Sequence, residues 1–179
     1  MRFISLVFVV FLFIFKAHAN SEKNYDSRAK YVYINSIFSD KKFTIYRENN
    51  EFGTVYSGSD VQSEAIFCNY YSEFYCVTSF DITFSVPKDI NLYTKQWQFK
   101  NKIYSVSAKN QELTIWGKNF KDVYIIDGPM TTFIDYVAFP SKQMKFVYSK
   151  GYGLLGFGYN DSDNFFWSVS EKGFGSHDL

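Results

Sequence analysis

Residues 66–86, IFCNYYSEFYCVTSFDITFSV, alternate between apolar and polar side chains. From position 74 onward, the even-numbered positions hold Phe74, Cys76, Phe80, Ile82, Phe84 and Val86, with Thr78 as the one polar member. Most odd-numbered positions are polar. A period of two is typical of a β-strand that buries one face. The stretch therefore predicts an antiparallel β-sheet.

The chain has only two cysteines, and both lie in this stretch. Folding the segment back about Ser72 places Cys68 opposite Cys76 and Ile66 opposite Thr78. Directly opposed residues bring their Cβ atoms to about 4.5–5.5 Å, which is close to disulfide reach. We therefore predict a Cys68–Cys76 cross-strand disulfide, with two free buried thiols as the alternative. The C-x7-C spacing is not that of a C-x-x-C redox motif.

Short apolar segments separated by turn residues continue along the rest of the chain. Aromatic residues make up 22 % of it, and such residues favour pleated, half-buried surfaces. Each of the three prolines follows an apolar segment, where it disturbs no ladder of hydrogen bonds. We expect an all-β fold, an antiparallel β-sandwich or barrel of roughly 10–12 short strands. Residues 31–38 fit either a strand or one short N-terminal helix.

The N-terminus has the layout of an export signal. Arg2 precedes the apolar run 3–15, and small residues at positions 17 and 19 suit a signal peptidase. We expect cleavage between Ala19 and Asn20, so that residues 1–19 are a signal peptide. This run of 13 residues, apolar except for Ser5, is shorter than the roughly 20 that a membrane-spanning helix needs. The predicted organisation is a flexible segment at 20–30 and a single β-rich domain at 31–179, in a periplasmic or secreted protein.

Charge and histidine content argue against several function classes. Loss of Arg2 and Lys16 changes 19 basic residues to 17 against 18 acidic ones, a net charge of −1. A nearly neutral chain offers nucleic acid no clustered positive surface. His177 is the one histidine after the signal, so His-dependent catalysis and His/Cys zinc sites lack their residues. We expect no cofactor, no metal, no catalytic set and no membrane span after signal removal.

Two motifs near the C-terminus suggest ligands but have simpler interpretations. Gly151-x-Gly153-x-x-Gly156 matches a dinucleotide-binding turn, yet turn-forming residues follow it where a helix would have to begin. We expect these glycines to permit bulges or to make room for aromatic rings within a tightly packed strand. The segment 160–164, NDSDN, is rich in oxygen ligands but does not match an EF-hand loop, so we expect a hairpin turn.

Three functions remain open at this stage. The first is a small exported non-catalytic binding protein with a protein partner: an inhibitor, an immunity-type protein or an envelope accessory protein. The second is a carbohydrate-binding module or small glycosidase. It would bind polysaccharide on Trp97, Trp116 and Trp167 or use two of the carboxylates Glu64, Glu73, Glu112, Asp127 and Asp135. The third is an outer-membrane β-barrel, disfavoured by the polar end of the chain.

Overall fold

The computed structural model describes residues 28–58, 61–131, 142–159 and 165–176. Within these ranges the protein is all-β and contains no helix. The strands are β1 (Ala29–Asn35), β2 (Lys42–Arg47), β3 (Phe52–Ser57), β4 (Val61–Phe67), β5 (Phe74–Thr78), β6 (Thr83–Pro87), β7 (Gln96–Phe99), β8 (Lys102–Ile115), β9 (Lys118–Thr131), β10 (Lys142–Ser149), β11 (Gly153–Tyr159) and β12 (Phe165–Ser168). Twelve described strands match the expected number, and the predicted fold class is confirmed.

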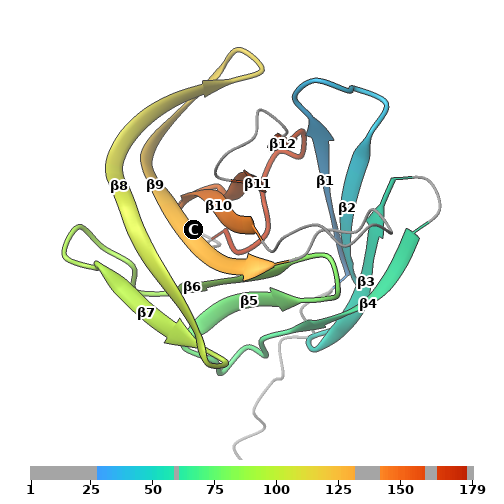
Figure 1. The fold of residues 1–179 in the computed structure, drawn as a ribbon, viewed down its shortest axis with the longest axis horizontal. Helices are drawn as coiled ribbons and strands as arrows, with labels where there is room; N and C mark the ends of the chain where they lie inside the picture. The colour runs from blue at the N-terminus through green and yellow to red at the C-terminus, as the bar shows by residue number, and fades with distance from the viewer. Residues whose placement is uncertain (1–27, 59–60, 132–141, 160–164, 177–179) are drawn as a thin grey trace, which may run out of the picture.

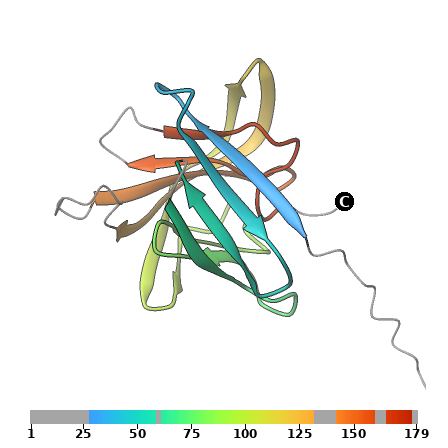
Figure 2. The ribbon, with the colours of Figure 1, turned by 90° about the vertical axis from the view of Figure 1, so that its right-hand side faces the viewer.

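All of these strands belong to one antiparallel sheet that curls into a nearly closed barrel (Figure 1). The order is β6-β5-β4-β3-β2-β1-β12-β11-β10-β9-β8-β7, so almost every strand pairs with its neighbour in sequence. Pairing of β1 with β12 joins the first and last strands of the described residues. Seen from the side, β1 to β4 run obliquely to β10 and β11 (Figure 2).

The stretch around the cysteines forms the hairpin of β4 and β5. Ile66 pairs with Thr78, as expected, and Cys68 is bonded to Cys76 with a Cα–Cα distance of 5.1 Å. The predicted disulfide is therefore confirmed. The alternating run after position 74 is two strands, however, because the chain turns between β5 and β6. The side chain of Ser79 holds this turn by accepting the backbone N–H groups of Asp81 and Ile82.

A helix at 31–38 was one of two interpretations of that segment, and it is wrong. Most of the segment is β1, which pairs with β2 on one side and β12 on the other. Two ladders satisfy its backbone, so a helix would gain nothing. Ile37 and Phe38, which suggested an apolar helical face, are exposed in the turn that follows. The side chain of Asn35 caps this turn by accepting their two backbone N–H groups.

β8 and β9 form one long hairpin where sequence predicted shorter pieces (Figure 1). The polar stretch around Lys109 is not a turn between two strands but a series of bulges, with Asn110 and Asp122 in the left-handed backbone region. Bulges bend a strand without ending it. Pro129 likewise lies inside β9 rather than after it. The register of β10 shifts opposite it, so the ladder does not need the missing N–H group.

Side chains close the gap between the outer strands β6 and β7. The indole N–H of Trp97 donates to the hydroxyl of Ser85 at 3.1 Å, and the hydroxyl of Tyr104 donates to the backbone carbonyl of Thr83 at 3.1 Å. Trp97 and Tyr104 also stack on each other, with ring centroids 5.5 Å apart. These contacts cover the free edge of β6, which would otherwise attract another strand.

Residues 173–175 pack into the core of the barrel. Phe174 is 3 % exposed and lies against Tyr31, Phe67 and Phe84. Its backbone is held from both sides, because its N–H donates to the hydroxyl of Tyr33 and its carbonyl accepts the N–H of Leu154. We call residues 173–175 the plug. It belongs to the same apolar core as the barrel strands.

Two glycines of the motif, Gly153 and Gly156, lie in the sheet as expected, whereas Gly151 lies in the turn before it. β11 runs from Gly153 to Tyr159, and no helix follows it among the described residues. A Cβ atom at Gly156 would lie 2.5 Å from the indole ring of Trp167, so the glycine makes room for that ring. At Gly153, φ is +80° and a Cβ atom would meet the carbonyl of Gly173 at 2.3 Å, so this glycine lets the plug approach.

Candidate functional site

In both β2 and β6, two inward-facing apolar residues are followed, two positions later, by a positively charged residue. On β2, Phe43 and Ile45 are buried in the core and Arg47 occupies the next position of the same parity. On β6, Phe84 and Val86 are buried in the core, and Lys88 follows with the same spacing just after the strand ends. Two strands on opposite sides of the β3–β5 segment thus bring a cation to one rim of the barrel. We call Arg47 and Lys88 the rim pair.

Arg47 is held rigidly at this rim. Its Nε donates to the carbonyl of Asn49 at 3.0 Å, and its Nη2 donates to the carbonyl of Asn50 at 2.8 Å. The guanidinium carbon lies 5.4 Å from the ring centroid of Phe67, which also contacts the plug. Burial lowers the pKa of Arg47 because its charged form is partly removed from water. An arginine stays protonated at physiological pH all the same.

Lys88 reaches the same rim from β6. Its Nζ donates to the carbonyl of Tyr70 at 2.6 Å and lies 5.4 Å from the ring centroids of Tyr70 and Tyr75. Burial lowers the pKa of Lys88, and the positive charge of Arg47 lowers it further. Tyr75 also contacts the plug, since a Cβ atom at Gly175 would lie 3.0 Å from it.

The loop between β4 and β5, residues 68–73, borders this rim, and we call it the clamped loop. The disulfide closes its base, and the N–H of Cys68 donates to the carbonyl of Cys76. Tyr70 and Tyr71 are 67 % and 91 % exposed, and their rings meet edge to face. A short loop with a covalent base thus presents two tyrosine rings beside two cations.

A shallow hollow of about 420 Å³ lies where the clamped loop meets the end of β6. Its lining residues are Glu73, Phe74, Pro87, Lys88 and Asp89. The carboxylates of Glu73 and Asp89 thus share one hollow, which the sequence could not show. Both residues are exposed, whereas a carboxyl that acts as a general acid is usually kept away from water so that its pKa rises. The hollow is better suited to binding than to acid catalysis.

The other carboxylates named from the sequence are spread over the sheet. Glu64 is exposed on β4, Glu112 forms an ion pair with Lys121, and Asp127 pairs in register with Lys145 on β10. Asp135 lies outside the described residues. Sequence analysis also missed the buried carboxyl of Asp81, whose Oδ2 accepts a hydrogen bond from Ser63. Burial raises the pKa of Asp81 and the bond from Ser63 lowers it, with burial the larger effect.

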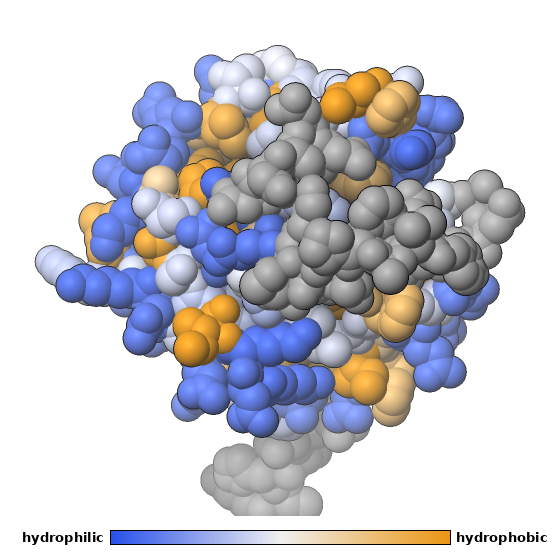
Figure 3. Space-filling model, in the orientation of Figure 1, coloured by the Kyte–Doolittle hydropathy of each residue, from blue (hydrophilic) through white to orange (hydrophobic). Residues whose placement is uncertain are grey.

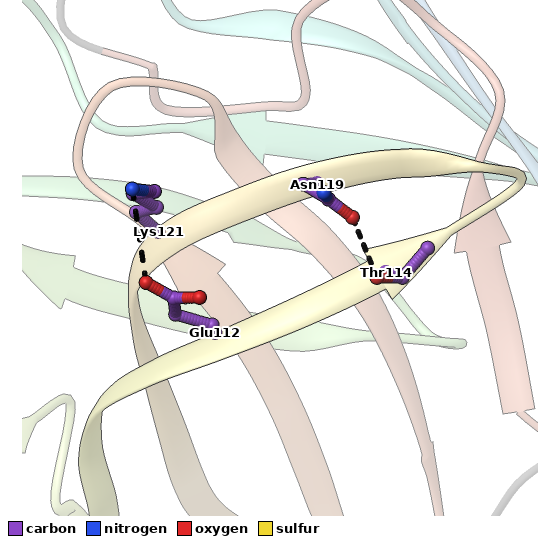
Figure 4. A network of polar contacts seen from close by, with 4 residues as sticks. All are labelled: Glu112, Thr114, Asn119 and Lys121. Atoms are coloured by element: carbon purple, nitrogen blue, oxygen red, sulfur yellow. Dashed lines mark hydrogen bonds and ion pairs between the residues drawn. The ribbon is translucent and has the colours of Figure 1, made fainter.

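The three tryptophans have different environments. Trp97 is buried and Trp167 is packed against Phe165, so neither offers a free ring face to a sugar. Trp116 is 61 % exposed at the tip of the β8–β9 hairpin. Below this tip, two polar contacts join the strands, a hydrogen bond from Thr114 to Asn119 and the ion pair of Glu112 with Lys121 (Figure 4).

Exposed hydrophobic residues do not form one broad surface on the face shown in Figure 3. They form small patches separated by hydrophilic residues. Isolated patches of this kind suit a few anchoring side chains better than a wide apolar interface.

Sequence analysis predicted the disulfide but not the rim pair. A signal was available: Phe43-x-Ile45-x-Arg47 and Phe84-x-Val86-x-Lys88 share one pattern, two apolar inward positions followed by a cation. The predicted cleavage site at Ala19 and Asn20, the segment 160–164 and His177 lie outside the described ranges. Among described residues, no group of three or more His, Cys, Asp or Glu side chains could hold a metal ion.

Comparisons of this chain with protein-family models, characterised proteins and solved structures find no match. The described part of the chain also contains no helix with the length and hydropathy of a membrane span. The functional argument therefore rests on the clamped loop and the rim pair themselves.

Proposed function

We propose that this chain is a small exported binding protein without catalytic activity, which holds a protein partner against the clamped loop. The observation that carries the proposal is the exposed pair Tyr70 and Tyr71 on a loop whose base is closed by the disulfide. Tyrosine rings are frequent anchors of protein interfaces because they supply contact area with few rotatable bonds. An inhibitor, an immunity-type protein or an envelope accessory protein would act in this way.

The disulfide supports this proposal energetically. Binding normally costs free energy to order loops and side chains, and a loop that is already constrained loses less freedom. The bond from Lys88 to the carbonyl of Tyr70 restrains the middle of the loop as well. The rings are thus presented in one arrangement before a partner arrives.

Export is part of the proposal. The pattern of residues 1–19 is typical of a cleaved signal, and the disulfide is of the kind that persists outside the reducing cytosol. Mass spectrometry of the protein from its own producing cells should find Asn20 as the first residue. A product that keeps Met1 would contradict export.

The partner can be sought by affinity capture with the immobilised mature protein. The double substitution Tyr70→Ser with Tyr71→Ser should weaken capture about 30-fold or more, since anchoring residues contribute about 2 kcal/mol or more. Tyr93→Ser is the matched control, because Tyr93 is 91 % exposed on a different loop. Capture that withstands the double substitution, or hydrolase activity in a substrate screen, would overturn the proposal.

A second candidate is a carbohydrate-binding module, and the exposed ring of Trp116 is the observation that favours it. Sugar rings stack on exposed indole rings, and the polar groups below the hairpin tip could orient their hydroxyls (Figure 4). Tryptophan fluorescence should then respond to a polysaccharide, and Trp116→Ala should abolish the response. Fluorescence that stays constant across a panel of polysaccharides would count against this function.

A further inference from the structure

The rim pair lacks negative partners within the protein. Among the described residues the one ion pair joins Lys121 and Glu112, far along the sheet from this rim. Arg47 and Lys88 instead donate only to backbone carbonyls, which carry no net charge. Two positive charges are thus held at this rim without an ion pair to a carboxylate of the described residues.

We propose that the rim pair binds a carboxylate of an acidic peptide segment that belongs to the partner. This inference rests on the proposed function and adds the chemistry of the group that the partner supplies. Arg47 and Lys88 would contact the carboxylate, and Tyr70 and Tyr71 would contact apolar side chains next to it in the peptide.

The hydrogen-bond donors of Arg47 and Lys88 that are not used within the protein suit a carboxylate. Arg47 uses Nε and Nη2 for the turn carbonyls, and its Nη1 makes no hydrogen bond within the described part of the chain. Lys88 uses one of its three donors for the carbonyl of Tyr70. A carboxylate accepts several hydrogen bonds, and those from charged donors are stronger than those from neutral ones. The aromatic rings beneath both cations fix where the charges lie.

The surrounding charges favour a peptide over an acidic polysaccharide. Glu73 and Asp89 line the hollow beside Lys88, although neither forms an ion pair with it. A polyuronate carries a carboxylate on every ring, so some of its charges would be repelled by these two residues. A peptide with one carboxylate between apolar residues places a single negative charge at the rim pair and avoids this repulsion.

The inference can be tested by NMR with the isotope-labelled, disulfide-bonded mature protein at low salt. The probe is the blocked pentapeptide Gly-Phe-Glu-Phe-Gly, and the control is the same peptide with Gln in place of Glu. The Glu peptide should bind with a Kd of a few millimolar or lower, as is typical of one charged contact with two ring contacts, and should shift the backbone signals of Arg47 and Lys88. The Gln peptide should bind several-fold more weakly.

Substitutions then locate the contact. Lys88→Gln should weaken the Glu peptide about three- to fivefold, as expected for one partly exposed ion pair, and Glu73→Gln should tighten it. Lys118→Gln is the matched control, because Lys118 also lies over two rings, 5.5 Å from Phe120 and 5.1 Å from Tyr152, but away from the rim pair. It should leave binding unchanged. The test does not depend on substituting Arg47, whose side chain also holds a turn.

Equal binding of the two peptides, an equal effect of Lys118→Gln and Lys88→Gln, or tighter binding of tetragalacturonate than of the Glu peptide would each overturn the inference. The outcome is separable from that of the proposed function. If the Glu peptide fails but partner capture still requires Tyr70 and Tyr71, only the carboxylate contact is wrong. If capture does not require the tyrosines, the proposed function itself is wrong.

Discussion

Replacing Phe174 by alanine removes the central ring of the plug and should destabilise the whole barrel. The ring is 3 % exposed, and its centroid lies 5.7, 5.6 and 6.2 Å from those of Tyr31, Phe67 and Phe84. These three residues come from β1, β4 and β6, so the loss affects distant parts of the sheet at once. The cavity cannot close easily, because the barrel strands around it are paired with one another.

The magnitude follows from the burial. Truncating a fully buried Phe to Ala costs about 3–5 kcal/mol, which combines the lost transfer free energy with the cavity that remains. Three aromatic neighbours place Phe174 toward the upper part of this range, since each aromatic pair adds about 0.5–1.5 kcal/mol. We therefore expect Phe174→Ala to lower the free energy of unfolding by about 4 kcal/mol.

Equilibrium unfolding in urea, followed by tryptophan fluorescence of the disulfide-bonded protein, measures this loss. With a slope of about 2–3 kcal/mol per molar urea, the midpoint should fall by about 1.3–2 M. Val169→Ala is the control, because Val169 precedes the plug and is 45 % exposed. It should change the midpoint little. A loss below about 1 kcal/mol for Phe174→Ala would refute the assignment of the plug to the core.

Gly156→Val should lower the melting temperature, because overpacking a core costs about 1–3 kcal/mol. Gly151→Ala is the control, since a Cβ atom at Gly151 meets no atom within 4 Å. Equal melting temperatures for the two variants would contradict the packing argument. Replacing Cys68 and Cys76 together by serine should cost about 2.5 kcal/mol in urea unfolding, the chain-entropy value for so short a loop. An unchanged midpoint would mean that the bond does not constrain the unfolded chain. Burial raises the pKa of Asp81, so the folded state binds the proton of this carboxyl more tightly than the unfolded state does. The protonated carboxyl therefore contributes stability below the unfolded pKa, and this contribution is lost as the pH rises through the folded pKa. In Asp81→Asn this part of the pH dependence should vanish in unfolding curves recorded between pH 3 and pH 7, and an identical pH profile for both proteins would show that burial does not perturb this carboxyl.

The pairing of Cys68 with Cys76 is a feature that the local sequence was sufficient to predict. Alternation fixed which side chains share a face, and a reversal near Ser72 fixed the register, because a slip by one residue would move every side chain to the other face. The turn at Ser79 escaped the same reasoning. Its apolar and polar residues continue the alternation of the strands on both sides, so the pattern alone gave no sign that the chain reverses there.

The position of Arg47 and Lys88 at one rim could not be predicted from local sequence. Each sequence segment indicates that a cation follows two inward apolar positions, but neither indicates that β2 and β6 bring their cations to one rim. That proximity arises because β3, β4 and β5 lie between them in a sheet that curls. Curvature results from the twist accumulated over many strands, and no short segment carries that information.

The sequence by itself determined the all-β class, the disulfide and the role of the glycines, since each depends on alternation or on close neighbours along the chain. Only the tertiary structure decided that residues 173–175 pack into the barrel core, that side chains close the gap between β6 and β7, and that two cations lie at the rim beside the clamped loop. These features depend on contacts between segments far apart in the chain. Such contacts form only when the burial of a shared core compensates for the entropy lost in bringing the segments together.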